Sequence, residues 1–311
     1  MNCPEYEPIA KGVILHIDKL LAPGDIVALT GAIHALHLRR PEWVIDPRCI
    51  ARELFENTSY IGDLEANGKS ITEHTISQSL INESNHFAIH MMEAWAASIY
   101  DVTGLTYTAP QLKPHVPLSS QELAAVPEGK YVVINAGWKE DNTTKRWNGY
   151  QRVVDQLSMR HKVYQVGELN PDWHNHPHLK GATNLIGKTS LRELATLVSG
   201  AALVITPLSL PMHLAAAYER PCVVIAGGRE PVTWSQYPHT HMIHSLGALP
   251  CSQTPCWKAR VKPRKDGKRF DDSLCEMPYT LPGESGYIAT CMQDIDPAEV
   301  LEKSWRLVAT S

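Results

Sequence analysis

The sequence contains no long apolar run, no export signal and no internal repeat. Its 311 residues hold no stretch of about 18 apolar residues, the length needed for a membrane-spanning helix. The opening residues, MNCPEYEPIAKG, lack a basic region followed by an apolar one, so we expect no secretory signal and a cytoplasmic location. The sequence shows no repeat with a period of about 20 to 50 residues, so it does not indicate a solenoid. These absences favour a globular protein. Its length exceeds that of one ordinary hydrophobic core and predicts two.

An excess of positive charge is also lacking. The formal net charge of −4 gives no overall attraction to nucleic acid, although residues 258–269 hold seven basic side chains and one acid. The seven cysteines are unevenly placed. Without an export signal they argue against disulfides and favour free thiols or thiolate metal ligands.

Strand-like and helix-like segments alternate along the chain. GVILHI (12–17) and WVID (43–46) have the composition of buried strands, and the apolar spacing from Ile26 to Leu38 predicts a helix that Pro41 ends. Residues 86–104 predict another helix. Residues 108–130 contain four prolines and no sustained apolar period, which is typical of a linker with at most one short helix.

The second half alternates more regularly, which predicts a parallel sheet covered on both faces. Thr189 or Ser190, followed by Glu193, is a typical helix start, and so is Asp296 with Pro297. The pattern predicts two doubly wound α/β domains, residues 1–110 and 130–311, joined by a linker over 111–129, with a ligand crevice between the domains. The predicted strands are 130–137, 162–168, 184–187, 202–207 and 221–227, and the predicted helices are 148–160, 190–201, 211–220 and 296–309.

The turn LAPGDIVALTG places Asp25 where a strand gives way to a helix. In open α/β sheets this position faces the ligand crevice. Two interpretations of Asp25 are open from these residues alone. It is either an N-cap of the helix or a carboxylate in the crevice that acts as a general base.

Three later turns are candidates for binding phosphate. NAGWKEDNTTKRW joins a strand to a helix, and its hydroxyls and amides, with Lys145, are suited to phosphate oxygens; an ordinary polar loop is the alternative. In PMHLAAAYER the helix opens with His213, where the first amides favour a diphosphate; a capping or core histidine is the alternative. Gly227 and Gly228 after the next strand would let a flat group approach the backbone.

Four cysteines occur late in the chain with the spacing C-x4-C-x18-C-x15-C: Cys251, Cys256, Cys275 and Cys291. Four thiolates suit a tetrahedral zinc or iron site, although the spacing is looser than a C-x2-C pair. Four soft ligands without an open position would make the site structural. Free thiols and disulfides are the alternatives.

Several blocks together resemble glycosyltransferase family 9, the ADP-heptose-dependent heptosyltransferases. The resemblance covers most of the second half and roughly residues 12–40 of the first. The four late cysteines resemble the metal-binding finger of the branch that glycosylates bacterial autotransporter proteins. The blocks are LAPGDIVALTGAIHALH, KYVVINAGWKEDNTTKRWNGYQRVVDQL, NLIGKTSLRELATLVSGAALVITPLSLPMHLAAAYERPCVVIAGGREPVTW and CMQDIDPAEV.

The resemblance implies a GT-B fold, in which two Rossmann-like domains face each other across a cleft and a four-cysteine metal finger (249–292) is inserted late in the second. It implies an inverting transfer without a catalytic metal, from an ADP-sugar bound by the C-terminal domain to a hydroxyl of a protein or glycan acceptor. Asp25 would be the base. Thr143, Thr144 and Lys145 would bind the diphosphate with help from His213; Ser209, Met212, Gly227 and Gly228 complete the predicted donor site.

One departure bears on the donor. The family has Asp-Ser-Gly before Pro-Met-His, where this chain has Leu208, Ser209 and Leu210. The expected donor sugar is heptose or a related sugar, and the departure leaves two alternatives open: the donor is not heptose, or the sugar is bound in a different position. A protein that binds a sugar nucleotide without turnover, and a glycosyltransferase acting on nucleic acid through its basic finger, are the alternative functions. The sequence leaves the metal, iron or zinc, and any homo-oligomer open.

Overall fold

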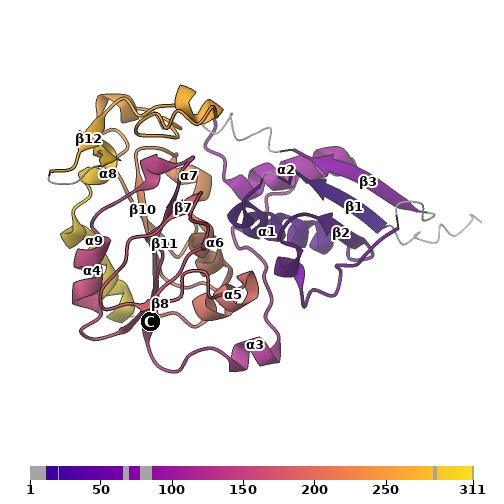
Figure 1. The fold of residues 1–311 in the computed structure, drawn as a ribbon. Helices are drawn as coiled ribbons and strands as arrows, with labels where there is room; N and C mark the ends of the chain where they lie inside the picture. The colour runs from indigo at the N-terminus through magenta and orange to yellow at the C-terminus, as the bar shows by residue number, and fades with distance from the viewer. Residues whose placement is uncertain (1–11, 20, 66–69, 78–85, 283–285, 310–311) are drawn as a thin grey trace, which may run out of the picture. The chain divides into compact units, whose positions relative to one another are not determined.

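The computed structural model describes residues 12–19, 21–65, 70–77, 86–282 and 286–309. The chain divides into two compact units, each described separately below (Figure 1). Unit 1 comprises Met1–Ile81 and Met91–Ser119, and unit 2 comprises Asn82–His90 and Ser120–Ser311. The division at Ser119 and Ser120 falls within the predicted linker stretch, where the short helix α3 (Ser120–Ala124) begins.

Unit 1 contains a three-stranded parallel sheet with the order β2-β1-β3. The strands are β1 (Gly12–Ile17), β2 (Val44–Arg48) and β3 (Ile71–Ile76), and the helices are α1 (Pro23–Arg39), α2 (Met91–Thr103) and the 3-10 turn η1 (Arg52–Phe55). The predicted strands at 12–17 and 43–46 and the helix ending before Pro41 are confirmed, whereas β3 was not predicted.

The helix predicted over 86–104 is shorter than expected, because α2 begins only at Met91. His90 lies just before it, is 3% exposed, and packs edge-on against Tyr237 with 4.7 Å between ring centroids. Residues 86–90 are therefore irregular, and the side chain of His90 is buried in unit 2.

Unit 2 contains a six-stranded parallel sheet, so the predicted strand–helix alternation is confirmed. Its order is β11-β10-β9-β4-β6-β8, and every neighbouring pair is parallel. The strands are β4 (Tyr131–Ile134), β6 (Lys162–Gln165), β8 (Thr183–Asn184), β9 (Leu203–Pro207), β10 (Cys222–Gly227) and β11 (Thr240–His244). The helices are α4 (Tyr150–Leu157), α5 (Leu191–Ser199), α6 (Leu210–Ala217), α7 (Val232–Ser235) and α9 (Pro297–Ala309).

Both predicted helix starts are confirmed. Ser190 accepts from the Glu193 amide at 3.1 Å, and the Glu193 carboxylate accepts from the Ser190 amide at 2.7 Å. This reciprocal pair satisfies two donors that the first turn of α5 leaves open. Asp296 accepts from the Ala298 amide at 2.9 Å at the start of α9.

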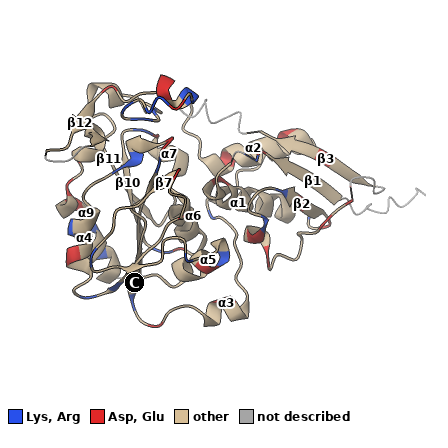
Figure 2. Ribbon diagram, in the orientation of Figure 1, with Lys and Arg blue, Asp and Glu red and all other residues tan. Residues whose placement is uncertain are grey.

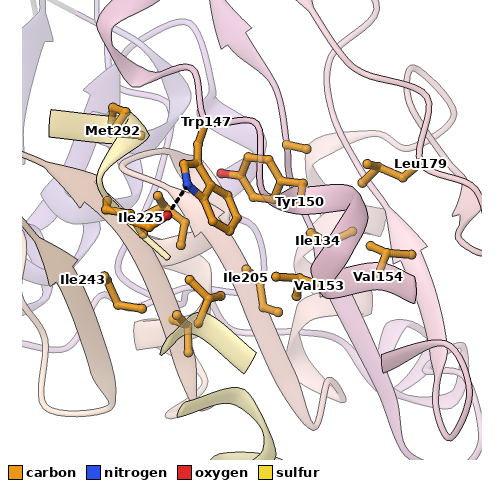
Figure 3. Packing of buried hydrophobic residues seen from close by; sticks show 14 of the residues in the cluster. Ile134, Trp147, Tyr150, Val153, Val154, Leu179, Ile205, Ile225, Ile243 and Met292 are labelled. Carbon is orange, nitrogen blue, oxygen red and sulfur yellow. Dashed lines mark hydrogen bonds between the residues drawn. The ribbon is translucent and has the colours of Figure 1, made fainter. Parts of the chain in front are cut away.

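The core of unit 2 joins the sheet to α4 and to the C-terminal region. Trp147 and Tyr150 pack edge-to-face with ring centroids 4.8 Å apart, over isoleucines of neighbouring strands (Figure 3). The buried Trp147 Nε1 donates to the Ile295 carbonyl at 3.1 Å, so burial of the indole leaves its donor paired.

The segment before α9 consists of short pieces rather than long elements. Between β11 and α9 the chain forms η4 (Pro250–Ser252), η5 (Arg269–Asp272), β12 (Pro278–Thr280), β13 (Tyr287–Ala289) and α8 (Thr290–Gln293). Earlier in unit 2 there are three more short elements, β5 (Trp138–Lys139), η3 (Thr143–Lys145) and β7 (His174–Asn175). Arg260 organises the basic stretch: it is 1% exposed and pairs with Asp266 at 2.7 Å and Asp271 at 2.5 Å. A buried guanidinium with two carboxylates fixes the loop around itself.

Lysine and arginine are interspersed with aspartate and glutamate along both units (Figure 2). None of the helices within the described residues has the length and apolar character required to cross a membrane.

Candidate functional site

Lys145 lies at the centre of a polar cluster in unit 2. Its ammonium donates to the Leu208 carbonyl at 3.0 Å, just before α6, and forms an ion pair with Glu230 at 2.9 Å. The Lys145 side chain is 22% exposed and that of Glu230 is 9% exposed. The cluster follows the carboxyl ends of β4, β9 and β10, where doubly wound sheets bind their ligands.

Glu230 is held as a carboxylate despite its burial. Burial alone would raise the pKa of this carboxyl, but the charges of Lys145 and Arg229 outweigh it and the pKa is lowered. Arg229 contacts the same carboxylate and also donates to the Lys258 carbonyl at 3.0 Å. The cluster therefore joins two basic side chains, Lys145 and Arg229, to one buried carboxylate.

His213 lies in the first turns of α6 and is 6% exposed. Its Nδ1 is 2.7 Å from the hydroxyl of Tyr237. Burial, with smaller contributions from His90 and Lys145, lowers the pKa of His213 to about 3, so the ring is neutral near pH 7. When the tyrosine hydroxyl donates to Nδ1, the ring proton is on Nε2, which makes Nε2 a donor.

The other predicted residues of the α6 block lie close by. Ser209 precedes α6 in an extended conformation. Its hydroxyl is 2.7 Å from that of Thr206 and accepts from the side-chain Nδ2 of Asn135 at 3.2 Å. Met212 is 1% exposed and Leu208 is 6% exposed, so both are buried. The structure thus gathers Lys145, Ser209 and His213 around the start of one helix.

Thr143 and Thr144 have partners in the late segment of the chain. The Thr144 hydroxyl donates to the Lys258 carbonyl at 2.8 Å, and Thr144 is 4% exposed. The Thr143 hydroxyl accepts from the Val261 amide at 2.9 Å, which leaves its own proton able to donate elsewhere. These contacts fasten residues 258–261 to the turn that carries Lys145; whether both threonines bind phosphate stays a prediction.

Gly227 and Gly228 are explained by packing. Gly227 has φ of +63°, and a Cβ there would lie 2.5 Å from the Met292 sulfur; a Cβ at Gly228 would lie 2.8 Å from Cβ of Ser252. The side on which a Cβ would project is therefore occupied by this chain's own residues. Their predicted contact with a donor stays a prediction.

The four late cysteines line one small cavity of about 20 Å³, together with Thr144 and Arg229. This volume is about that of one ion or water molecule. Burial raises the pKa of Cys251, Cys275 and Cys291, the last to about 11, and neighbouring thiols raise each of these three values further. In the part of the chain that the structure describes, no group of three or more histidine, cysteine, aspartate or glutamate side chains has an arrangement that could hold a metal ion.

Asp25 is the third residue of α1, in unit 1. Its carboxylate accepts from the Ala22 amide at 3.0 Å, and Ala22 is the N-cap residue. The alternative that Asp25 is itself the N-cap is wrong, because Ala22 occupies that position. One carboxylate oxygen is thus oriented by the helix start, and its role as a base stays a prediction.

Sequence reasoning missed three residues of the Lys145 cluster. Arg229 and Glu230 follow β10 in the turn REP. Two adjacent, oppositely charged residues at the carboxyl end of a parallel strand could have indicated a place in the ligand site. Tyr237 lies in an irregular stretch, where nothing in the local pattern indicates a partner for His213.

The fold is shared with solved glycosyltransferases, each at low identity. The iron-containing dodecameric glycosyltransferase TibC from enterotoxigenic E. coli H10407 is 17% identical, with a TM-score of 0.65 over 96% of this chain and 76% of that one. The glycosyl transferase family 9 protein of Veillonella parvula DSM 2008 is 13% identical, with a TM-score of 0.66 over 97% of this chain and 98% of that one. The ADP-heptose LPS heptosyltransferase II of E. coli is 16% identical, with a TM-score of 0.60 over 96% and 99%.

The family model for glycosyltransferase family 9 (heptosyltransferase) matches residues 74–262, more than half of the chain. The comparison with curated protein sequences gave no match. The matched range includes the Lys145 cluster and ends within the late cysteine segment. The α/β units with parallel sheets, the GT-B neighbours and the family match agree: the chain belongs to glycosyltransferase family 9 and is a glycosyltransferase.

Proposed function

We propose that this glycosyltransferase transfers heptose or a related sugar from an ADP-linked donor to a hydroxyl of a protein or glycan acceptor, with inversion at the anomeric carbon. The observation that carries the proposal is the Lys145 ammonium at the start of α6, 3.0 Å from the Leu208 carbonyl and 2.9 Å from Glu230. A second TibC structure is of its complex with ADP-D-β-D-heptose, which supports an ADP-sugar for this chain.

The diphosphate of the donor binds at Lys145 and the first turn of α6 in this proposal. Negative charge grows on the departing phosphate as the glycosidic bond breaks. A lysine ammonium, the positive end of a helix and the Nε2–H of a neutral His213 stabilise that charge more in the transition state than in the ground state. Thr143 donates its hydroxyl proton to the same phosphates, while Thr144 anchors the turn.

Asp25 removes the proton from the acceptor hydroxyl. The contact with the Ala22 amide orients one carboxylate oxygen at the start of α1. The attacking oxygen then bonds to the anomeric carbon on the face opposite the diphosphate, which is why the configuration inverts. No metal takes part in these steps.

The sugar itself is recognised partly by an apolar wall. Leu208 and Leu210 stand where the family has aspartate and glycine, and Leu208 is 6% exposed. An isobutyl group cannot accept a hydrogen bond from a sugar hydroxyl, so we propose that the donor is either a related sugar or heptose held in a different orientation.

We propose that Cys251, Cys256, Cys275 and Cys291 close around a structural iron or zinc ion when it binds, since the described side chains are not yet in a metal-ligating arrangement. The chemistry of the donor set fits, since four thiolates satisfy either metal, and the four side chains line a cavity of about 20 Å³. The TibC neighbour is described as iron-containing and dodecameric, which supports iron and a homo-oligomer. A cytoplasmic location follows from the proposal, because a reducing compartment keeps thiols available to a metal.

The experiment is to compare wild-type protein with Asp25→Asn. Asparagine still accepts from the Ala22 amide, so the helix start is retained while the base is lost. We expect unchanged ADP affinity by calorimetry and no transfer from ADP-heptose or other ADP-sugars. Full transfer in the variant would refute the assigned base. ADP binding without transfer or hydrolysis in the wild type would instead show a binding protein.

A further inference from the structure

A cavity of about 500 Å³ lies within unit 1, apart from every residue assigned above. Its walls come from the second half of α1, from Tyr100 of α2 and from residues 108–115. The volume is in the usual range for small-molecule sites. Along α1, His34 is about 13 Å from Asp25 and Arg39 about 21 Å, at 1.5 Å per residue. A ligand here does not place its reacting atom at the proposed base.

The two walls are held together by close backbone packing. A Cβ on Gly31 would lie 2.1 Å from the Met92 methyl and 2.8 Å from the Lys113 carbonyl, so only glycine lets residues 113–114 approach α1. The Thr30 hydroxyl accepts from the His115 amide at 2.9 Å. These contacts hold residues 113–115 against α1.

Two histidines line the cavity as a stacked pair. The rings of His34 and His115 are 3.9 Å apart and within 7° of parallel. The Nδ1 of His34 is 3.0 Å from the Tyr60 hydroxyl, and burial raises the pKa of that tyrosine, so it keeps its proton. With Tyr60 donating to Nδ1, a neutral His34 carries its proton on Nε2.

Two basic side chains line the cavity. Arg39 and Lys113 supply two positive charges, and none of the thirteen residues that line the cavity is acidic. Burial lowers the pKa of both His34 and His115, the latter to about 4, so the ring pair adds donors but no charge near pH 7. The other walls are mostly small and apolar, with the Tyr100 ring among them.

We propose that this cavity is a second binding site, for a sugar-sized phosphate monoester. Arg39 and Lys113 match the two charges of the phosphate, the imidazole N–H groups donate to its oxygens, and Leu38, Pro110 and Tyr100 contact the body of the ligand. The site is independent of the ADP-sugar site in unit 2.

The test is calorimetry of the full chain with hexose 6-phosphate, inorganic phosphate, uncharged hexose and ADP. We expect hexose 6-phosphate to bind more tightly than either fragment. The double variant R39Q/K113Q should weaken it about 100-fold, since each of the two lost charge-assisted contacts is worth roughly tenfold. ADP affinity should be unchanged in this variant, which shows that unit 2 is intact. Arg306→Gln, at an exposed arginine paired with Glu302, is the matched control.

A second readout does not depend on the variants. Binding should shift the ring resonances of His34 and His115 in NMR spectra while leaving those of His213 in place. A dissociation constant for hexose 6-phosphate above about 10 mM would overturn the proposal. A dissociation constant in R39Q/K113Q equal to that of the wild type would also overturn it. So would binding that is lost in Lys145→Met, because the phosphate would then occupy the ADP site. Failure of ADP binding alone would count against the proposed function and not against this cavity.

Discussion

Replacing Lys145 with methionine tests the centre of the proposed donor site. Methionine keeps much of the apolar stem and removes the ammonium that contacts Glu230 at 2.9 Å and the Leu208 carbonyl at 3.0 Å. Removing one partner of a buried ion pair costs about 3–5 kcal/mol. Lys145 is 22% exposed and Arg229 still contacts Glu230, so we expect about 2 kcal/mol of the free energy of unfolding to be lost.

The same substitution should weaken ADP binding. A hydrogen bond to a charged group is worth about 1.5–3 kcal/mol, and about 1.4 kcal/mol is tenfold in affinity. ADP should therefore bind roughly 10- to 100-fold more weakly by calorimetry. Lys188→Met is the matched control, because the exposed Lys188 ammonium donates to the Asn184 carbonyl, outside the Lys145 cluster. It should change neither quantity.

The loss of stability in Lys145→Met should also depend on pH. The pKa of Glu230 is lowered in the folded protein, so this group contributes stability above its unfolded pKa, near 4.5, and the contribution is lost as the pH falls through the folded value. Urea unfolding should show the difference between wild type and variant at pH 7 and a smaller one at pH 4. A folded variant with unchanged ADP affinity would refute Lys145 as the diphosphate ligand.

Two further outcomes follow from the same unit. Gly227→Ala should lower the melting temperature, because φ of +63° costs an alanine about 1–2 kcal/mol and its Cβ would meet a sulfur atom at 2.5 Å. Gly247→Ala has φ of +81° but open space, so it isolates the strain; equal shifts in the two variants would exclude crowding. The pKa of His213 is lowered to about 3 in the folded protein, so the stability of the wild type should fall as the pH drops from 6.5 to 3. The free energy of unfolding of His213→Asn in urea should be less sensitive to pH over this range. An equal pH dependence in the two proteins would contradict the lowered pKa of His213.

The sequence pattern was sufficient for the buried elements of the fold and insufficient for the exposed ones. VVI in β4 and LVIT in β9 are continuous apolar runs, as strands covered on both faces require. β3, with the sequence ITEHTI, has a largely exposed face, and β11, THMIH, carries two histidines. Tertiary pairing with β1 and β10, rather than local composition, makes these segments strands.

The candidate site was predictable where a turn follows a parallel strand. Lys145 and His213 satisfy this rule, and the structure brings their turns together. The roles of Thr143 and Thr144 depend on residues more than 110 positions later, which no local pattern indicates. The same is true of Tyr237, whose hydroxyl lies 2.7 Å from Nδ1 of His213.

The late cysteine segment and the Lys145 cluster are connected by direct contacts. Arg229 lines the cysteine cavity, contacts Glu230 and donates to the Lys258 carbonyl, which also accepts from the Thr144 hydroxyl. A metal that orders residues 256–261 would therefore also hold the turn carrying Lys145 in place. This connection predicts that the cysteine segment affects donor binding through the position of Lys145.

Thr144→Val separates this connection from the metal itself. Valine keeps the volume but removes one donor to the Lys258 carbonyl, which still accepts from Arg229, at a cost of about 1 kcal/mol. We expect ADP affinity to fall several-fold while the four cysteines are unchanged. Thr103→Val, whose hydroxyl donates within its own helix to Ile99, should leave ADP affinity unaltered. Reduced stability with wild-type ADP affinity in Thr144→Val would mean that the turn is positioned without the cysteine segment, and that segment would then serve stability alone.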